Sequence, residues 1–448
     1  MLYLDLNTHH SRCGFKSFIL NTSFYLIGNM QKIKKNKNTY GLKSRISLTL
    51  ALIILSRFGT FIPVPGVDHD AFYQSISNNP IVSFLNIFSG GGFASIGIFA
   101  LGIVPYINAS ILIQLGTTSI SSLEKLQKEE GEAGRQKISQ ITRYIALGWA
   151  IVQSLGVSFW VRPYVFNWDI QFIFEMTLAL TTGSMLVMWI SEQITEKGVG
   201  NGASMLIFVN IISGLPKLIQ QNSSNPGSSN MSELIILALI FLVMIIGIIF
   251  VQEGTRRIPV ISARQLGKGQ LENKTSYLPL RLNQGGVMPI IFASAFLVLP
   301  AYISQITTNP IALKVASTLS PNGGNKIIYL TFYFLLILFF SYFYASLILN
   351  PSDVSKNLKK MESSIPGIRP GKATTDYLQK TLNRLTFLGA LFLAFIAVVP
   401  SVIENLTNIS TFKGLGATSL LILVGVAIDT SKQVQTYMIS KNYESILK

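Results

Sequence analysis

The chain has few of the residues that carry most metal, disulfide and nucleophilic chemistry. Its 448 residues include one cysteine, Cys13, and three histidines, His9, His10 and His69. A single cysteine excludes an internal disulfide, and so few histidines exclude a histidine-rich metal site. The glycine and lysine spacing of a Walker A loop does not occur either, so the sequence offers no recognisable phosphate cradle. We therefore expect no metal site, no cofactor and no enzymatic reaction.

Charged residues are scarce as well. They make up 12% of the chain, whereas a soluble protein uses about 25%. Apolar residues make up 49%, and the mean hydropathy is +0.46. These values exclude a soluble enzyme and a disordered scaffold. The net charge of +16 comes from 36 Lys and Arg against 20 Asp and Glu, and in a membrane protein such an excess usually lies in loops on one face.

Long apolar segments are what the sequence has in abundance. A bilayer core requires about 20 mostly apolar residues per helix. Windows of that length give ten candidates, at residues 44–64, 99–120, 141–161, 170–191, 199–219, 234–251, 285–304, 327–349, 385–403 and 415–429. The sequence therefore predicts an all-α integral membrane protein with ten transmembrane helices.

The distribution of Lys and Arg predicts the orientation of these helices. Ten spans place both termini on one side of the membrane. With the N-terminus inside, the inner segments carry 30 Lys and Arg and the outer loops carry five, while Arg57 lies within the first span. Because positive residues accumulate on the cytoplasmic side, we expect both termini there.

Two segments of nine residues repeat one pattern. Residues 102–110 and 286–294 both read G-x-x-P-x-I-x-A-S, and they lie in the second span of each group of five. Five is an odd number, so the second half enters the membrane inverted. Gly and Pro are common in membrane helices, but five shared identities at equivalent positions favour a duplication. Such interrupted segments in inverted halves indicate a transport site between them.

Three predicted regions follow from this repeat. Residues 1–40 form an N-terminal extension and cytoplasmic tail, residues 41–220 the first five-helix half, and residues 221–448 the second half. Ionisable residues within the spans are few, with Arg57 and Glu175 as examples. Because an ion-coupled pump needs titrating groups across the bilayer, their scarcity favours a passive pore. The glycine-rich residues 198–202 open a span, and we interpret them as a close-packing or hinge element.

The inner loops are longer than orientation alone requires. Residues 121–143, 252–284 and 350–384 each carry several charges. Orientation and solubility account for most of these charges. Loops of some thirty residues nevertheless favour docking surfaces for a cytoplasmic motor or a ribosome.

Long sequence runs resemble the SecY family, the channels of the general protein-export pathway. The matching runs lie at residues 61–67, 86–91, 99–114, 131–138, 189–202, 256–260, 278–294, 366–371 and 443–444. The resemblance begins near Gly41, and the first 30 or so residues have no counterpart. It implies an hourglass-shaped pore between two inverted five-helix halves.

The resemblance also assigns three sets of residues around the pore. A ring of aliphatic side chains at the waist corresponds to Ile103, Ile107, Ala203, Ile207, Ile291 and Ile422. The plug, a half-helix near residues 84–95, includes Asn86, Phe88, Ser89, Gly90, Gly91 and Gly92. Its three glycines lower helix propensity by about 1 kcal/mol each relative to Ala, so we expect a weakly held segment. The lateral gate, formed by spans two and three against seven and eight, includes Gly102, Pro105, Asn108, Gly286, Pro289 and Phe292, with Asn108 and Phe292 expected on the lipid side.

Partners and location also follow from the resemblance. It implies a SecE-type clamp subunit, a SecA-type motor ATPase, a SecG-like subunit, ribosomes, unfolded preproteins and membrane lipid as partners. The predicted docking residues are Arg256, Arg257, Arg264 and Arg369. Abundant Ile, Asn and Lys resemble chloroplast-encoded members, which favours the thylakoid membrane, with a bacterial inner membrane as the alternative. A secondary transporter for a small solute is the rival function, and a non-conducting membrane anchor fits the Gly/Pro-broken repeat poorly.

Overall fold

The computed structural model describes residues 41–69, 71–72, 86, 89–128, 131–223, 231–262, 276–294, 296–297, 318–319, 326–407 and 417–446. Most of these residues are helical. The helices are α2 (Leu42–Thr60), α5 (Val104–Ser119), α6 (Ser121–Lys128), α7 (Gly131–Val161), the short η2 (Arg162–Tyr164), α8 (Ile170–Lys197), α9 (Gly202–Ser223), α10 (Met231–Glu253), α14 (Lys326–Ile348), α15 (Pro351–Lys360), α16 (Lys372–Thr407) and α17 (Ala417–Ile446). Three short strands are β1 (Thr255–Ser262), β2 (Ser276–Arg281) and β3 (Ser363–Ser364).

Each of the ten predicted spans coincides with helical residues, including residues 288–294 for the seventh. In the part of the chain that the structure describes, four helical segments are both long and apolar enough to cross a membrane: Gly131–Tyr164, Ile170–Lys197, Ile327–Lys360 and Lys372–Pro400. Two shorter apolar helices, Gly202–Gly214 and Leu239–Glu253, accompany them. The prediction of an all-α membrane protein is thus confirmed for the fold class.

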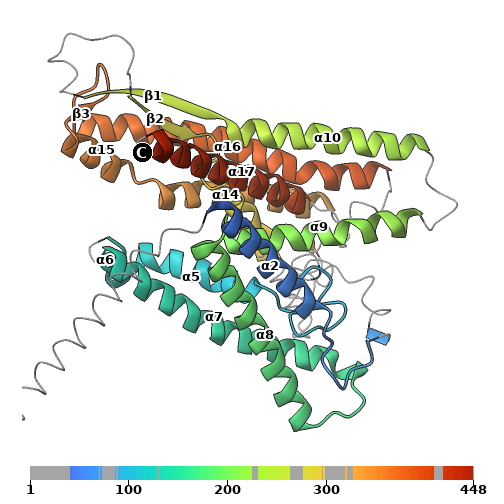
Figure 1. Ribbon diagram of the computed structural model, residues 1–448. Helices are drawn as coiled ribbons and strands as arrows, with labels where there is room; N and C mark the ends of the chain where they lie inside the picture. Colours follow the sequence, from blue (N-terminus) through green and yellow to red (C-terminus); the bar gives the residue numbers. More distant parts are fainter. Residues whose placement is uncertain are drawn as a thin grey trace, which may run out of the picture.

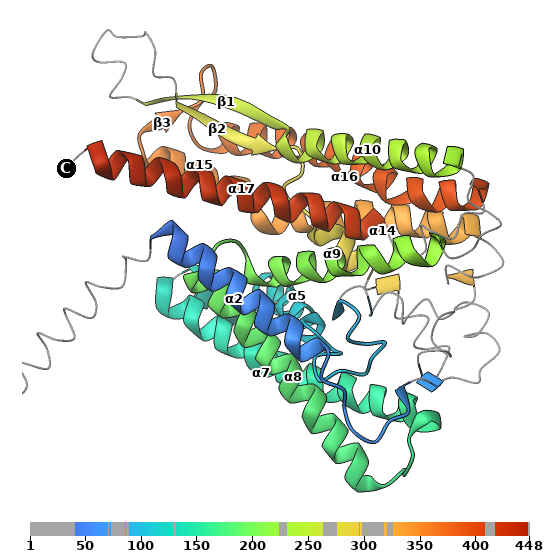
Figure 2. The same ribbon diagram turned by 45° about the vertical axis from the view of Figure 1, so that its right-hand side comes forward.

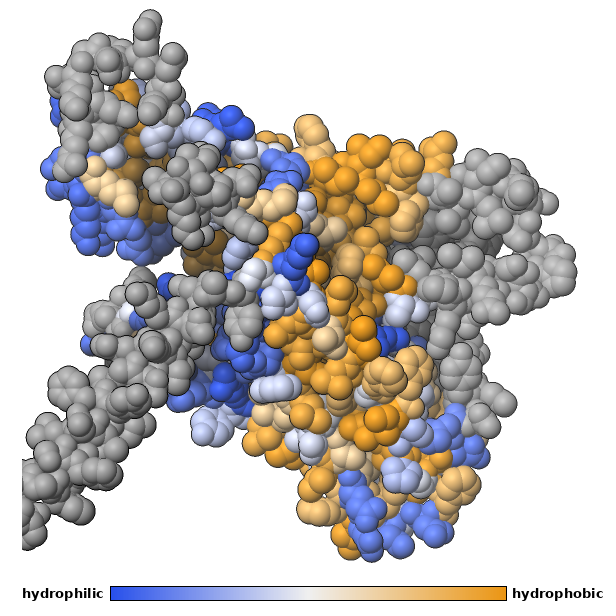
Figure 3. Space-filling model, in the orientation of Figure 1, coloured by the Kyte–Doolittle hydropathy of each residue, from blue (hydrophilic) through white to orange (hydrophobic). Residues whose placement is uncertain are grey.

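Large apolar side chains are exposed along the outer faces of these helices. On α10, for example, Leu242, Ile246 and Phe250 are exposed. Apolar side chains form a broad band in Figure 3, and hydrophilic side chains gather at the end that carries β1, β3 and α15. A helix that is apolar all round is a buried or membrane-spanning helix. The band therefore marks the surface that faces lipid.

Several helices extend beyond the predicted spans. Helix α16 begins 13 residues before the predicted span at 385, and α17 continues to Ile446 rather than ending near 429. Hydropathy windows find only the apolar part of a helix, so polar extensions escape them. The second span is shorter than predicted, because α5 begins at Val104 and not at residue 99. Gly102 has a positive φ, which a helix does not allow.

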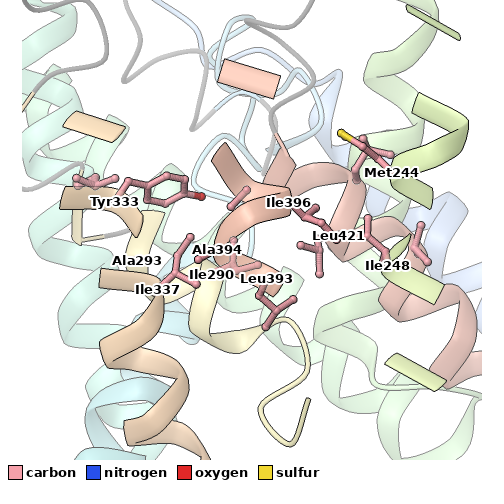
Figure 4. Close-up of a cluster of buried hydrophobic side chains, with 14 residues drawn as sticks. Met244, Ile248, Ile290, Ala293, Tyr333, Ile337, Leu393, Ala394, Ile396 and Leu421 are labelled. Atoms are coloured by element: carbon pink, nitrogen blue, oxygen red, sulfur yellow. The ribbon is translucent and has the colours of Figure 1, made fainter. Parts of the chain in front are cut away.

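The helices form two groups with α9 between them (Figures 1 and 2). Helices α2 and α5 to α8 lie on one side, and α10 and α14 to α17 lie on the other. The second group has its own hydrophobic core, formed by α10, α14, α16, α17 and residues 290–297. Figure 4 shows Ile248, Ile337, Leu393 and Leu421 pointing into this core. Helix α17 packs against both α10 and α9, so it joins the two groups.

The charged inner segments contain folded structure that the sequence analysis did not predict. Strands β1 and β2 form an antiparallel hairpin that pairs Thr255 with Arg281, and β3 pairs with the other edge of β1. Ile258 and Leu280 of the hairpin pack against Leu378 of α16 in a small buried cluster. The hairpin is therefore packed onto α16.

Candidate functional site

The residues predicted as the pore ring lie together in one buried hydrophobic cluster. Its members include Ile103, Ile107, Ile207, Ile291 and Ile422, with Ala203 packed against it. They come from the start of α5, from α9, from the helical residues 288–294 and from α17. We call these six side chains the aliphatic cluster. Four elements far apart in the sequence thus supply one apolar cluster.

A cavity of about 770 Å³ adjoins the aliphatic cluster. Ile207, Ile291 and Ile422 line its apolar end. Polar side chains from the loop before α9 and from α17 also line it, among them Asn201, Thr430 and Gln433. Water wets such polar walls, whereas an apolar constriction excludes water and ions by dewetting. The sequence analysis missed the α17 residues because they lie beyond the predicted end of the last span.

The two copies of the repeated motif begin with the same backbone feature. Gly102 and Gly286 both adopt left-handed φ values, and a helix begins two residues after each of them. Pro105 and Pro289 each fall on the second helical residue, where a missing backbone N–H costs nothing. The Ser184 hydroxyl donates a hydrogen bond to the Gly102 carbonyl at 3.2 Å, and the Asn283 amide donates to the Gly286 carbonyl at 2.7 Å.

The predicted gate residues lie between the two helix groups, with one difference from expectation. Asn108 is partly buried on α5. Phe292 was expected on the lipid side but is buried, since its ring packs edge-on against Phe340 and Tyr344 of α14, at 5.8 and 5.6 Å. A sequence predicts the direction in which a helical side chain points only to within a residue or two. This explains why the predicted lipid-side position of Phe292 was wrong. Gln114 of α5 faces the Tyr344 side chain of α14.

The described plug residues are Asn86 and residues 89–92, while Phe88 lies outside the described residues. Asn86 and Ser89 are helical, and residues 90–96 form consecutive turns, because Gly90 and Gly91 have positive φ. The Asn86 side chain accepts a hydrogen bond from the Ala94 N–H at 3.1 Å, and the Ser89 hydroxyl accepts one from the Phe93 N–H at 2.9 Å. Ser89 is buried, so in this structure the segment is more tightly packed than its glycines predicted.

Three of the four predicted docking arginines are described, and they lie on the surface at the end of the molecule that carries the strands. Arg256 and Arg257 are exposed on β1, and the Arg257 guanidinium lies over the Tyr277 ring at 5.0 Å. Arg369 is exposed in the turn before α16, where its carbonyl accepts a hydrogen bond from Thr374. Arg264 lies outside the described residues.

The glycine-rich residues 198–202 are a close-packing element. A Cβ on Gly202 would lie 1.9 Å from the Ser191 carbonyl oxygen, so only glycine fits. The Gly200 N–H donates a hydrogen bond to the Gln433 side chain at 2.9 Å. This loop therefore joins α8 to α9 and contacts α17 beside the cavity described above.

Comparisons with known proteins agree with this architecture. A sequence profile of the SecY family matches residues 97–431. The chain is 71% identical to the protein translocase subunit SecY of Guillardia theta over 421 residues, covering 94% of this chain and 99% of that one. It is 74% identical to the same subunit of Pyrenomonas salina over 420 residues, covering 94% of this chain and all of that one.

A solved structure shares the fold at much lower sequence identity. Sec61 in the canine ribosome-channel complex from the endoplasmic reticulum matches with a TM-score of 0.60 and 18% identity, over 91% of this chain and 95% of that one. The profile covers about three quarters of the chain, and the two relatives cover nearly all of it. The chain therefore belongs to the SecY family.

Proposed function

We propose that the chain is the channel subunit of a protein translocase, which conducts unfolded preproteins across a membrane and releases hydrophobic segments sideways into lipid. A channel-forming role in protein translocation follows from family membership. The observation that carries the proposal is the aliphatic cluster at the end of a cavity that both apolar and polar side chains line. Isoleucine side chains offer an extended polypeptide no hydrogen-bond partner, so cargo of any sequence slides past them.

The plug and the gate complete this proposal. Residues 84–95 would block the resting pore, and their described part lies beside α2 and α7, where Phe93 stacks on Trp160 at 5.8 Å. Cargo with a hydrophobic segment would leave between α5 and the pair formed by residues 288–294 and α14. Gln114 and Tyr344 face each other across that boundary. A signal sequence with an apolar core of about 7–15 residues would have to separate these helices.

The energy for transport would come from partners, since we propose that the chain itself hydrolyses nothing. A SecA-type motor or a ribosome would dock on the exposed arginines of β1 and of the turn before α16. A SecE-type clamp and a SecG-like subunit would cover part of the apolar outer band. In support, the hairpin that carries Arg256 and Arg257 is anchored through Ile258 to the buried cluster on α16, which is a rigid base for docking.

The chain is a membrane protein, and we place it in the thylakoid membrane with both termini on the stromal side. Relatives of high identity from the algae Guillardia theta and Pyrenomonas salina favour a plastid location. The predicted inner segments at α6, the strands, α15 and the end of α17 lie at one end of the molecule in both views (Figures 1 and 2). This common side supports the predicted orientation, because positive loops stay on the side of synthesis.

A crosslinking experiment tests the position of the pore. A photoreactive amino acid replaces Ile103 or Ile291 in the reconstituted complex, and a preprotein is arrested during transport. Both positions should crosslink to the arrested chain, since both lie in the aliphatic cluster. Ile246, exposed on the outer face of α10, is the control. Crosslinks at Ile246 but not at Ile103 or Ile291 would contradict the proposed route.

A further inference from the structure

Arg57 is a charged residue in the first span that the proposed channel does not yet use. It lies in the last turn of α2, where it is partly buried. Its Nη1 donates hydrogen bonds to the Gly90 carbonyl at 3.1 Å and to Asn210 Oδ1 at 3.2 Å. Its guanidinium also lies over the Phe61 ring, 5.6 Å from the centroid. One guanidinium therefore links three separate parts of the chain: α2, the plug and α9.

The contact surface around Gly90 has no room for a larger residue. A Cβ on Gly90 would lie 2.3 Å from Arg57 Nη1 and 2.7 Å from Asn210 Oδ1. Gly90 also has a φ of 65°, a conformation that glycine adopts without strain. This conformation turns the Gly90 carbonyl towards Arg57. The backbone of the plug is thus shaped to meet the guanidinium and the amide together.

Neutral partners distinguish this contact from a salt bridge. Among the described residues, Arg57 makes no ion pair, and both of its hydrogen-bond acceptors are uncharged oxygens. A hydrogen bond to a charged group contributes more than a neutral one. An extended polypeptide entering the pore carries backbone carbonyls of the same kind. Cargo can therefore replace the Gly90 carbonyl at Arg57 without leaving the guanidinium unsatisfied.

We propose that Arg57 is a positioning residue that holds the plug closed, by bridging the Gly90 carbonyl to Asn210 of α9. We call this bridge the latch. It rests on the proposed channel function and adds a mechanism for it. The latch stabilises the resting position of the plug, and the carbonyls of an incoming polypeptide release it by exchange. Loss of the latch should open the resting pore without impairing the passage of cargo.

Cysteines at Thr60 and Gly92 provide a direct measure of plug closure. The ideal Cβ of Gly92 lies 3.4 Å from the Cβ of Thr60, close to the separation of about 3.5–4.5 Å in disulfides. In a Cys13→Ser background, the rate of disulfide formation between Thr60→Cys and Gly92→Cys reports how often the plug is in place. The reconstituted complex is also assayed for resting ion leak and for preprotein translocation.

The Arg57→Gln substitution is the main test. It should raise resting leak about tenfold, because the loss of one hydrogen bond to a charged group raises the open fraction of the plug by about that factor, and it should slow disulfide formation while translocation continues. Asn210→Ala, which keeps the charge, should change both readouts in the same direction. Arg162→Gln is the matched control, since Arg162 contacts Trp168 and not the plug. It should leave both readouts unchanged.

The outcomes separate the latch from the channel itself. Unchanged disulfide rate and leak in both Arg57→Gln and Asn210→Ala would overturn the latch. If Arg57→Gln does not accumulate, Asn210→Ala decides by the same criterion. Failure of the unsubstituted complex to translocate preprotein would instead overturn the proposed function, whatever the disulfide rates show.

Discussion

Gly102 and Gly286, 184 residues apart, share a left-handed backbone conformation, with φ of 53° and 59°. Each carbonyl accepts a side-chain hydrogen bond, and each glycine precedes a helix that carries Pro, Ile, Ala and Ser at the same spacing. Identical residues in identical conformations are what a duplicated motif predicts. The relationship supports the derivation of the two halves from one ancestor.

Substitution of Gly286 tests this conformation. A Cβ at Gly286 meets no atom within 4 Å, so Gly286→Ala introduces backbone strain alone. We expect a loss of about 1–2 kcal/mol of stability, measured as a lower melting temperature of the purified complex. Gly148→Ala is the control, because a Cβ there also meets no atom within 4 Å while Gly148 is helical. The control should leave the melting temperature unchanged or raise it. Equal decreases in both variants would contradict the proposed backbone strain at Gly286.

Polar substitution in the aliphatic cluster should hydrate the waist of the pore. Ile103→Asn and Ile291→Asn place amides where water is now excluded. Both should raise the resting ion conductance of single channels in planar bilayers several-fold. Ile246→Asn, on the outer face of α10, serves as the control. Conductance at the wild-type level in both cluster variants would count against the ring.

Removal of the Tyr344 hydroxyl should weaken the closed lateral gate. Tyr344→Phe removes the hydroxyl that faces Gln114, and a hydrogen bond between membrane helices contributes about 0.6 kcal/mol on average. The closed-to-open ratio should therefore fall about threefold. The measurement is insertion of signal sequences with graded hydrophobicity, which should shift towards less hydrophobic segments. Tyr342→Phe, more exposed on the same helix, should show no shift; a shift of equal size would refute the assignment.

Charge reversal at Arg369 tests the docking surface. Arg369 is exposed, so Arg369→Glu should leave the fold intact and repel an acidic partner surface. Motor-driven translocation should slow several-fold, while membrane insertion and complex assembly stay at wild-type levels. Arg369→Lys keeps the charge and should retain most of the rate. A wild-type translocation rate and motor affinity in Arg369→Glu would contradict the docking role. The charge would then serve only to orient the chain in the membrane.

Periodicity and motif spacing predicted the helices and the repeat well. Apolar windows predicted α10 and α14 almost to their ends, because these helices are apolar all round. The windows failed where polarity changes along one helix, as in α17, whose polar half lines the cavity. They also placed the start of α5 too early, since the positive φ of Gly102 delays the helix until Val104.

Contacts between distant segments were beyond prediction from the sequence. The six residues of the aliphatic cluster were named from the family resemblance, but their meeting depends on the packing of four elements. Nothing in the local sequence of Asn210 or Gln433 indicates a contact with Arg57 or Gly200. The predicted lipid-side position of Phe292 was wrong for the same reason. Its burial depends on the position of α14, which packs against it.

The most direct test of the channel is the transport of a preprotein by the purified complex. The chain is reconstituted with its clamp subunit and motor ATPase in vesicles, and a labelled preprotein is added with ATP. The account predicts that the preprotein becomes protected from external protease, and that a disulfide between Thr60→Cys and Gly92→Cys blocks this protection until it is reduced. Absence of protection under these conditions, together with ion-gradient-dependent uptake of a small solute, would contradict the account and favour a secondary transporter.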